Sequence, residues 1–207
     1  MKKIKLLFQG DSVTDAGRDK RNYHQLGNGY PKYAAELLTE SHPEIEFEFI
    51  NLGISGNRTS QLSDRLHPDA IALQPDIISI LIGVNDVWHR QSAVPVLTSD
   101  EQIELNYRMI LTNLRKYTNA KIMIIAPYLI EREDKAQVKA ELDRIIPVIR
   151  RLADELADVY VPLNEYIEEA VKVQSEPKYY SADGVHPNAN GARFIAEHYV
   201  RAIEPLL

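Results

Sequence analysis

The segment that decides the fold is residues 4–12, IKLLFQGDS, close to the start of the chain. It begins as an apolar run with one lysine and ends in Gly10, Asp11 and Ser12, residue types that favour a turn. A short apolar run bounded by turn residues is typical of a strand buried on both faces of a parallel sheet. We therefore predict a strand over Ile4–Gln9 that delivers a serine to its carboxyl end.

Four further apolar or β-branched runs are predicted as strands of the same sheet. They lie at Glu46–Leu52, Ile77–Ile82, Lys121–Ala126 and Val159–Leu163. The segments between them repeat apolar residues at the helical period, and one opens with the capping-box spacing of Ser99 and Gln102. We predict helices over residues 31–38, 99–117, 134–157 with a kink at Pro147, 164–173 with Asn164 as the cap, and 190–205.

This alternation of strands and helices predicts a three-layer α/β/α sandwich, with helices on both faces of a parallel sheet. The sequence contains no internal repeat, low-complexity tract or linker, so it is interpreted as one domain over residues 1–207. Ligands of such sheets bind at the carboxyl ends of the strands. The loops that follow the first three strands contain Ser12, Gly53 and Asn85, so one edge of the sheet is expected to hold a site.

Composition excludes several classes of protein. Hydrophobic residues make up 44% of the 207 residues and charged residues 26%, as in an ordinary globular protein. The net charge is −6 and no basic cluster occurs, which argues against nucleic-acid binding. The absence of cysteine excludes disulfides and thiolate chemistry. Lys5 interrupts the only apolar stretch near the N-terminus, and no run is long enough to cross a membrane, so we expect a cytoplasmic protein.

Ser12, His186 and Asp183 are the candidates for a nucleophilic triad. An activated serine needs a general base within hydrogen-bond reach and a third group that orients this base. Asp183 and His186 are three positions apart in a loop bounded by glycine and proline, so the carboxylate could hold Nδ1 while Nε2 faces Ser12. The other histidines are interpreted as surface groups. The residues alone also allow a capping serine, a surface turn at Asp183, or a metal-binding Asp–His pair.

Asn85 and Gly53 are the candidates for stabilising a developing negative charge. Acyl transfer places this charge on a carbonyl oxygen, which requires donors fixed in advance. The Asn85 amide and the backbone N–H groups of Ser12 and Gly53 could supply three such donors. A glycine at position 53 suits this role because no Cβ would block substrate from the backbone. An ordinary turn at Asn85 is the alternative reading.

Taken together, these blocks resemble the SGNH, or GDSL-like, hydrolase family, which is named after four residues in four blocks. The blocks occur here in order, with Ser12 in GDSVTD, Gly53 in NLGISGN, Asn85 in GVND and His186 in DGVHP. The match spans nearly the whole chain, and the one departure is Val13 where the family has leucine.

The resemblance implies a serine esterase. Ser12 would be the nucleophile, His186 the base and then the acid, and Asp183 the orienting carboxylate. An oxyanion hole would be formed by the Ser12 and Gly53 N–H groups and the Asn85 side chain. The resemblance also implies a five-stranded, flavodoxin-like sheet and neither a metal nor an organic cofactor.

The expected substrate is an acetylated carbohydrate, with xylo-oligosaccharides favoured because the first and third blocks resemble the intracellular acetylxylan-esterase branch of the family. Trp88 and Tyr180 are predicted to contact it, since flat aromatic rings suit sugars, and Asp11 is a further predicted substrate contact. A short-chain lysophospholipase or thioesterase is the alternative enzyme, and a non-catalytic ligand-binding α/β module is the alternative outside catalysis. The apolar stretch Ser92–Leu97 could serve a homo-oligomer interface.

Overall fold

The structure, a computed structural model, describes residues 1–176 and 178–207. Its centre is a five-stranded sheet in which all neighbouring strands run parallel, in the order β2-β1-β3-β4-β5. This order is that of flavodoxin-like folds, so the predicted fold class is confirmed. The strands are β1 (Lys2–Gly10), β2 (Ile45–Asn51), β3 (Ile77–Leu81), β4 (Lys121–Ile125) and β5 (Val159–Val161).

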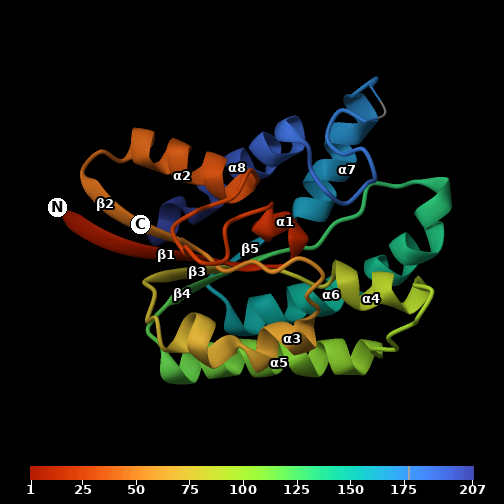
Figure 1. Cartoon of the computed structure of the whole chain (residues 1–207), viewed down its shortest axis with the longest axis horizontal. Coiled ribbons are helices and arrows are strands. Elements are labelled where there is room, and N and C mark those ends of the chain that lie inside the picture. Colours follow the sequence, from red (N-terminus) through yellow and green to blue (C-terminus); the bar gives the residue numbers. More distant parts are fainter. Residues whose placement is uncertain (177) are drawn as a thin grey trace.

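Helices cover both faces of this sheet (Figure 1). Helices α2 and α8 pack against each other on one face, with α7 beside them, whereas α3, α5 and α6 cover the other face. Their bounds are α1 (Ser12–Asp15), α2 (Tyr30–Ser41), α3 (Thr59–Asp64), α4 (Val84–Trp88), α5 (Asp100–Tyr117), α6 (Ala136–Leu156), α7 (Leu163–Val173) and α8 (Ala189–Ile203). Short turns of other helix types lie at His67–Ile71, His89–Gln91, Glu133–Lys135 and Glu204–Leu206.

The predicted long elements all occur, with bounds within a few residues of the prediction, but the predicted cap of α7 is wrong. Helix α7 begins one residue before Asn164, whose side chain therefore lies inside the first turn and does not cap it. Helix α8 begins at Ala189, and Asn188 caps it by accepting hydrogen bonds from the N–H groups of Asn190 and Gly191. The residue at the cap position of α7 is Pro162, two positions before Asn164.

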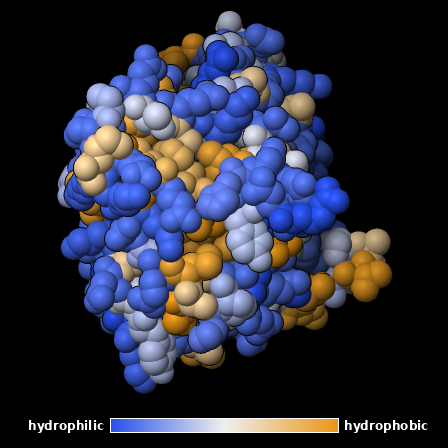
Figure 2. Space-filling view, turned by 60° about the vertical axis from the view of Figure 1, so that its left-hand side comes forward, coloured by the Kyte–Doolittle hydropathy of each residue, from blue (hydrophilic) through white to orange (hydrophobic). Residues whose placement is uncertain are grey.

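The core lies between the sheet and the two helix layers. Strand β3 is buried along its whole length, as expected for a central strand covered on both faces. Figure 2 shows a molecular face on which hydrophilic residues dominate, with smaller apolar areas between them. Val94 and Leu97 are each 83% exposed, which is compatible with the predicted role of Ser92–Leu97 in an interface. That role stays a prediction. Within the described ranges, no helix is both long and apolar enough to cross a bilayer.

Candidate active site

Ser12 occupies the first position of helix α1, two residues after the end of β1 at Gly10. The carboxylate of Asp11 accepts a hydrogen bond from the N–H of Val13 at 3.0 Å and thereby caps this helix. The alternative in which Ser12 is the cap is therefore wrong. The Ser12 hydroxyl is left free to face another part of the chain.

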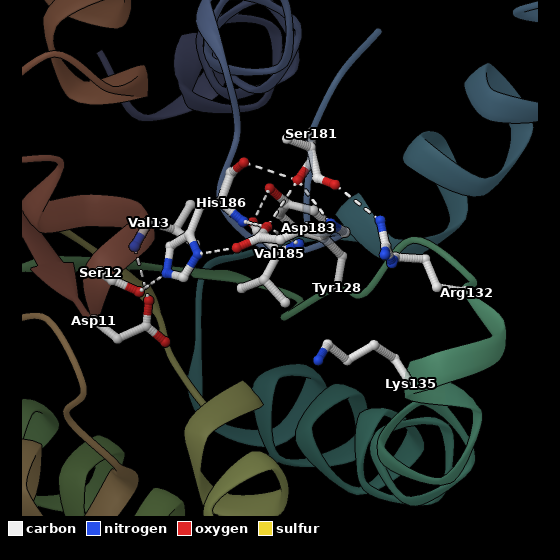
Figure 3. Close-up of polar contacts among 12 residues, drawn as sticks. Asp11, Ser12, Val13, Tyr128, Arg132, Lys135, Ser181, Asp183, Val185 and His186 are labelled. Carbon is white, nitrogen blue, oxygen red and sulfur yellow. Dashed lines mark hydrogen bonds and ion pairs between the residues drawn. The ribbon is translucent and has the colours of Figure 1, made fainter. Parts of the chain in front are cut away.

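That hydroxyl meets the loop that precedes α8, 174 residues later in the sequence (Figure 3). Ser12 Oγ lies 2.9 Å from His186 Nε2, and His186 Nδ1 lies 2.6 Å from Asp183 Oδ2. With the carboxylate beside Nδ1, this nitrogen carries the proton and donates a hydrogen bond to Asp183, so Nε2 accepts a hydrogen bond from the serine. The three predicted residues thus form one continuous chain of hydrogen bonds.

Asp183 is fixed by more than the imidazole. Its Oδ1 accepts from the backbone N–H groups of Val185 and His186 at 3.0 and 2.8 Å and from the Ser181 hydroxyl at 3.1 Å. Partial burial acts to raise the pKa of Asp183, but the hydrogen bonds from His186 and from these N–H groups outweigh it and hold the pKa well below its ordinary range. The carboxylate therefore stays ionised at neutral pH.

Asn85 lies in the first turn of α4, after β3, and faces the same cleft as Ser12. One hydrogen of its Nδ2 is donated to the carbonyl oxygen of Asn57 at 3.1 Å, which fixes the amide and leaves the second hydrogen for a ligand. The Ser12 N–H, at the start of α1, has no acceptor among the residues that the structure describes. Both groups fit the predicted role as donors.

Gly53 does not fit that role. Its N–H donates to Asn51 Oδ1 at 2.9 Å, and a Cβ at this position would lie 2.4 Å from the backbone nitrogen of Asp15. The glycine is required by the close approach of this loop to α1, and not by access of substrate to the backbone, as we had predicted.

Gly56, three residues later, has the properties that Gly53 lacks. It lines the cleft with Ser12 and Asn85, and its N–H has no acceptor within the described part of the chain. It is the third residue of a turn closed by the hydrogen bond from Asn57 N to Ile54 O, and its φ of +81° is a conformation that favours glycine. The third donor is therefore better assigned to Gly56, and the NLGISGN block contained both glycines.

These groups meet in a cleft of about 540 Å³ at the carboxyl ends of β1, β2 and β3. Trp88 and His89 form part of its wall, as the sequence predicted for Trp88 but not for His89. Its lining residues are Ser12, Val13, Ala16, Gly17, Asn28, Gly29, Ser55, Gly56, Asn85, Trp88, His89, Val185, His186 and Pro187. A larger hollow beside the edge strand β2 contains none of the residues of the hydrogen-bonded chain.

Comparison with known proteins agrees with this geometry. The family model of the GDSL-like lipase/acylhydrolase family matches residues 8–194. The chain belongs to this family. It is therefore a carboxylic ester hydrolase.

Two examples of relatives with solved structures match almost the whole of this chain. An acetylxylan esterase from Geobacillus stearothermophilus is 32% identical over 96% of this chain and 93% of its own, with a TM-score of 0.86. LAE5, an α/β hydrolase from the metagenome of Lake Arreo in Spain, is 29% identical over 99% of this chain and 96% of its own, with a TM-score of 0.88. Three separate catalytic mutants of the Geobacillus esterase each replace one residue by alanine: a serine, an aspartate, or a histidine three positions after that aspartate.

Two of the three predicted substrate contacts of this hydrolase lie elsewhere. The side chain of Asp11 is almost fully buried beneath the cleft, and it does not form part of the wall. Tyr180 packs against Tyr179 and Phe194 and lines a separate small hollow on α8. Of the three predicted contacts, only Trp88 lines the cleft. The ammonium of Lys135 lies 4.4 Å from the centre of the Trp88 ring.

Metal binding by the Asp–His pair finds no support in the donor set. Across residues 1–176 and 178–207, no three His, Asp or Glu side chains are arranged to hold one ion. Asp183 directs both of its oxygens to donors of its own loop, including the imidazole of His186.

Proposed function

We propose that this hydrolase removes acetyl groups from short acetylated sugars, in particular xylo-oligosaccharides, with Ser12 as the nucleophile. The observation that carries the proposal is the unbroken chain from Asp183 through His186 to Ser12, with distances of 2.6 and 2.9 Å, at the wall of an open cleft. Such a chain is how a serine hydroxyl becomes reactive at neutral pH.

In the first step, Ser12 Oγ attacks the acetyl carbonyl carbon while His186 Nε2 takes the hydroxyl proton. The new imidazolium is stabilised by Asp183, which its hydrogen bonds keep ionised. The C–O bond to the sugar then breaks, and His186 gives the proton to the departing sugar oxygen. The acetyl group remains on Ser12 as an ester.

The negative charge that develops on the carbonyl oxygen is met by the N–H groups of Ser12 and Gly56 and by the free hydrogen of Asn85 Nδ2. All three residues line the cleft. Because these donors are fixed by the fold, they need no reorganisation when the charge appears, which is the main source of such catalysis.

The second step releases acetate. A water molecule enters from the open side of the cleft, His186 takes one of its protons, and the hydroxide attacks the acyl carbon. The bond between the acyl carbon and Ser12 Oγ then breaks, and the imidazolium returns that proton to Oγ, which restores the starting state. The acetic acid that leaves loses its remaining acidic proton to the solvent and becomes acetate. The side chain of His186 is 54% exposed, so water has a direct route to Nε2.

The sugar is proposed as the leaving group on two grounds. The Geobacillus relative is an acetylxylan esterase that matches almost the whole chain. In addition, Trp88 lines the cleft with an aromatic ring, and aromatic faces suit the C–H faces of sugar rings.

An assay of acetylated xylo-oligosaccharides beside acetyl and octanoyl aryl esters tests the proposal. We expect acetate release from the oligosaccharides, faster hydrolysis of the acetyl than of the octanoyl ester, and loss of both activities in Ser12→Ala. Preference for the octanoyl ester would favour the lysophospholipase or thioesterase alternative. Binding of the sugars without hydrolysis would favour a non-catalytic module.

A further inference from the structure

Arg65 lies directly after α3 and has its side chain buried behind the cleft, with 14% of it exposed. It is absent from the cleft wall and has no hydrogen bond to Ser12, His186 or Asp183. Its guanidinium nevertheless contacts each loop that supplies a donor to the proposed oxyanion hole, either directly or through one further hydrogen bond.

Two of these contacts reach main-chain carbonyl oxygens at the ends of adjacent strands. Arg65 Nη2 donates to the carbonyl of Gly10 at 3.1 Å, and Nη1 donates to that of Leu52 at 2.8 Å. Gly10 is the last residue of β1, two positions before Ser12, and Leu52 follows the last residue of β2. One side chain thus ties the serine loop to the loop that leads to Gly56.

A third contact continues to Asn85. Arg65 Nε donates to Asn57 Oδ1 at 2.8 Å, and the carbonyl oxygen of Asn57 accepts from Asn85 Nδ2 at 3.1 Å. The loop 52–57 is therefore held by Arg65 at both of its ends, with Gly56 between them. Nη1 also lies 2.8 Å from Gln9 Oε1 and 2.8 Å from Asp69 Oδ2, so its two hydrogens are shared among three acceptors, which keep the guanidinium in place.

From these contacts we propose that Arg65 is a positioning residue for ester hydrolysis, which fixes the Gly56 and Asn85 donors relative to Ser12. Arginine suits this task because its planar guanidinium donates in several fixed directions at once, whereas a lysine ammonium is a compact charge on a flexible stem. The inference rests on the proposed function, since it assigns a purpose to the same oxyanion hole.

The test is Arg65→Lys, assayed with 4-nitrophenyl acetate. A displaced oxyanion hole stabilises the transition state less but leaves binding of the ground-state substrate unchanged. We therefore expect kcat to fall on the order of 10–100-fold, with KM within about threefold of the wild-type value. In an Asn85→Ala background, where one of the positioned donors is already gone, the same substitution should cost at least about threefold less.

Arg115→Lys is the matched control. Arg115 also donates to a main-chain carbonyl, that of Leu156 at 2.7 Å, and pairs with a carboxylate, that of Asp158 at 2.9 Å, but near the amino ends of β4 and β5. The Arg115→Lys variant should keep kcat within about twofold of the wild-type value, even if its melting temperature falls as much as that of Arg65→Lys.

Three outcomes would overturn the proposal: an unchanged kcat in Arg65→Lys, a rise in KM alone, or the same loss in both backgrounds. If Arg65→Lys does not fold, Asn57→Ala removes only the acceptor of Nε and should lower kcat by about tenfold; an unchanged kcat there is equally decisive. A wild-type protein without Ser12-dependent hydrolysis would instead overturn the proposed function itself.

Discussion

The serine loop (Gly10–Asp15) and the histidine loop (Ser181–Pro187) meet at the site but differ in their exposure to solvent. Asp11, in the serine loop, is 1% exposed. In the histidine loop, 46% of the Asp183 side chain and 54% of the His186 side chain are exposed. The nucleophile Ser12 is therefore half-buried on a loop that is anchored in the core, whereas its base is exposed at the surface, where water can reach it.

The two aspartates show what this difference does to a carboxylate. Burial raises the pKa of Asp11 to about 7, against which the N–H of Val13 and the nearby His186 act only in part. Partial burial also acts to raise the pKa of Asp183, but there the donors on both of its oxygens prevail and lower it. Proximity to the imidazole is thus not sufficient to keep a carboxylate charged; the extent of burial and the number of hydrogen-bond donors together decide.

The largest expected effect tests whether the two loops act as one unit. Ser12→Ala and His186→Ala should each lower kcat on 4-nitrophenyl acetate by about 10⁴–10⁶-fold, because members of a triad depend on one another. The double variant should be no slower than either single variant. If either single variant kept more than about a tenth of the wild-type rate, the loops would not share a mechanism.

Asp183→Asn sharpens the contrast between the two aspartates. Asparagine cannot hold the His186 tautomer that faces Ser12, so kcat should fall by about 10³–10⁴-fold. Asp11→Asn is the matched control, since its amide oxygen can still accept from Val13, and kcat should stay within about tenfold of wild type. Equal losses in the two variants would mean that Asp11 also contributes to the reaction.

Much of this arrangement could be predicted from the sequence, because it depends on local patterns. The apolar run before Gly10 predicted β1, and the spacing of Asp183 and His186 predicted a hydrogen bond that lies within a single loop. Their meeting with Ser12 was inferred from the rule that parallel strands share a carboxyl edge, and the structure places it there.

What the sequence did not predict depends on the direction of individual groups. Gly53 and Gly56 stand in one block, and only the hydrogen bond to Asn51 shows that the first N–H is already occupied. Similarly, a charged residue after a glycine suggests an exposed group, yet Asp11 caps α1 from within the core. His89 follows helix α4, whose five residues are too few to show a helical period, so the sequence did not indicate that His89 lines the cleft.

A smaller effect is expected at the oxyanion hole, between the two loops. Asn85→Ala removes one fixed donor and should lower kcat by about 10²–10³-fold, with little change in KM. Asn85→Asp is a useful companion, because it keeps the size of the side chain but places a carboxylate where negative charge develops. It should be at least as slow as Asn85→Ala, and a normal rate in either variant would remove Asn85 from the site.

The smallest expected effect concerns the stability of the fold and depends on Asp11, the buried aspartate of the serine loop. The pKa of Asp11 in the fold, about 7, lies above its ordinary value of 3.8, so the folded state binds this proton more tightly than the unfolded state. The stabilisation that the folded state gains from protonation of Asp11 is thus fully present below about pH 4 and is lost as the pH rises through 7.

Asp11→Asn mimics the protonated form at every pH. The melting temperature of the variant minus that of wild type, measured by circular dichroism, should therefore be at least about 2 °C larger at pH 8 than at pH 4.5, the scale of 1 kcal/mol for a chain of this size. Other titrating groups are common to both proteins and cancel in this difference. A difference that does not change with pH would show that Asp11 is ionised throughout this range, and the contrast with Asp183 would then disappear.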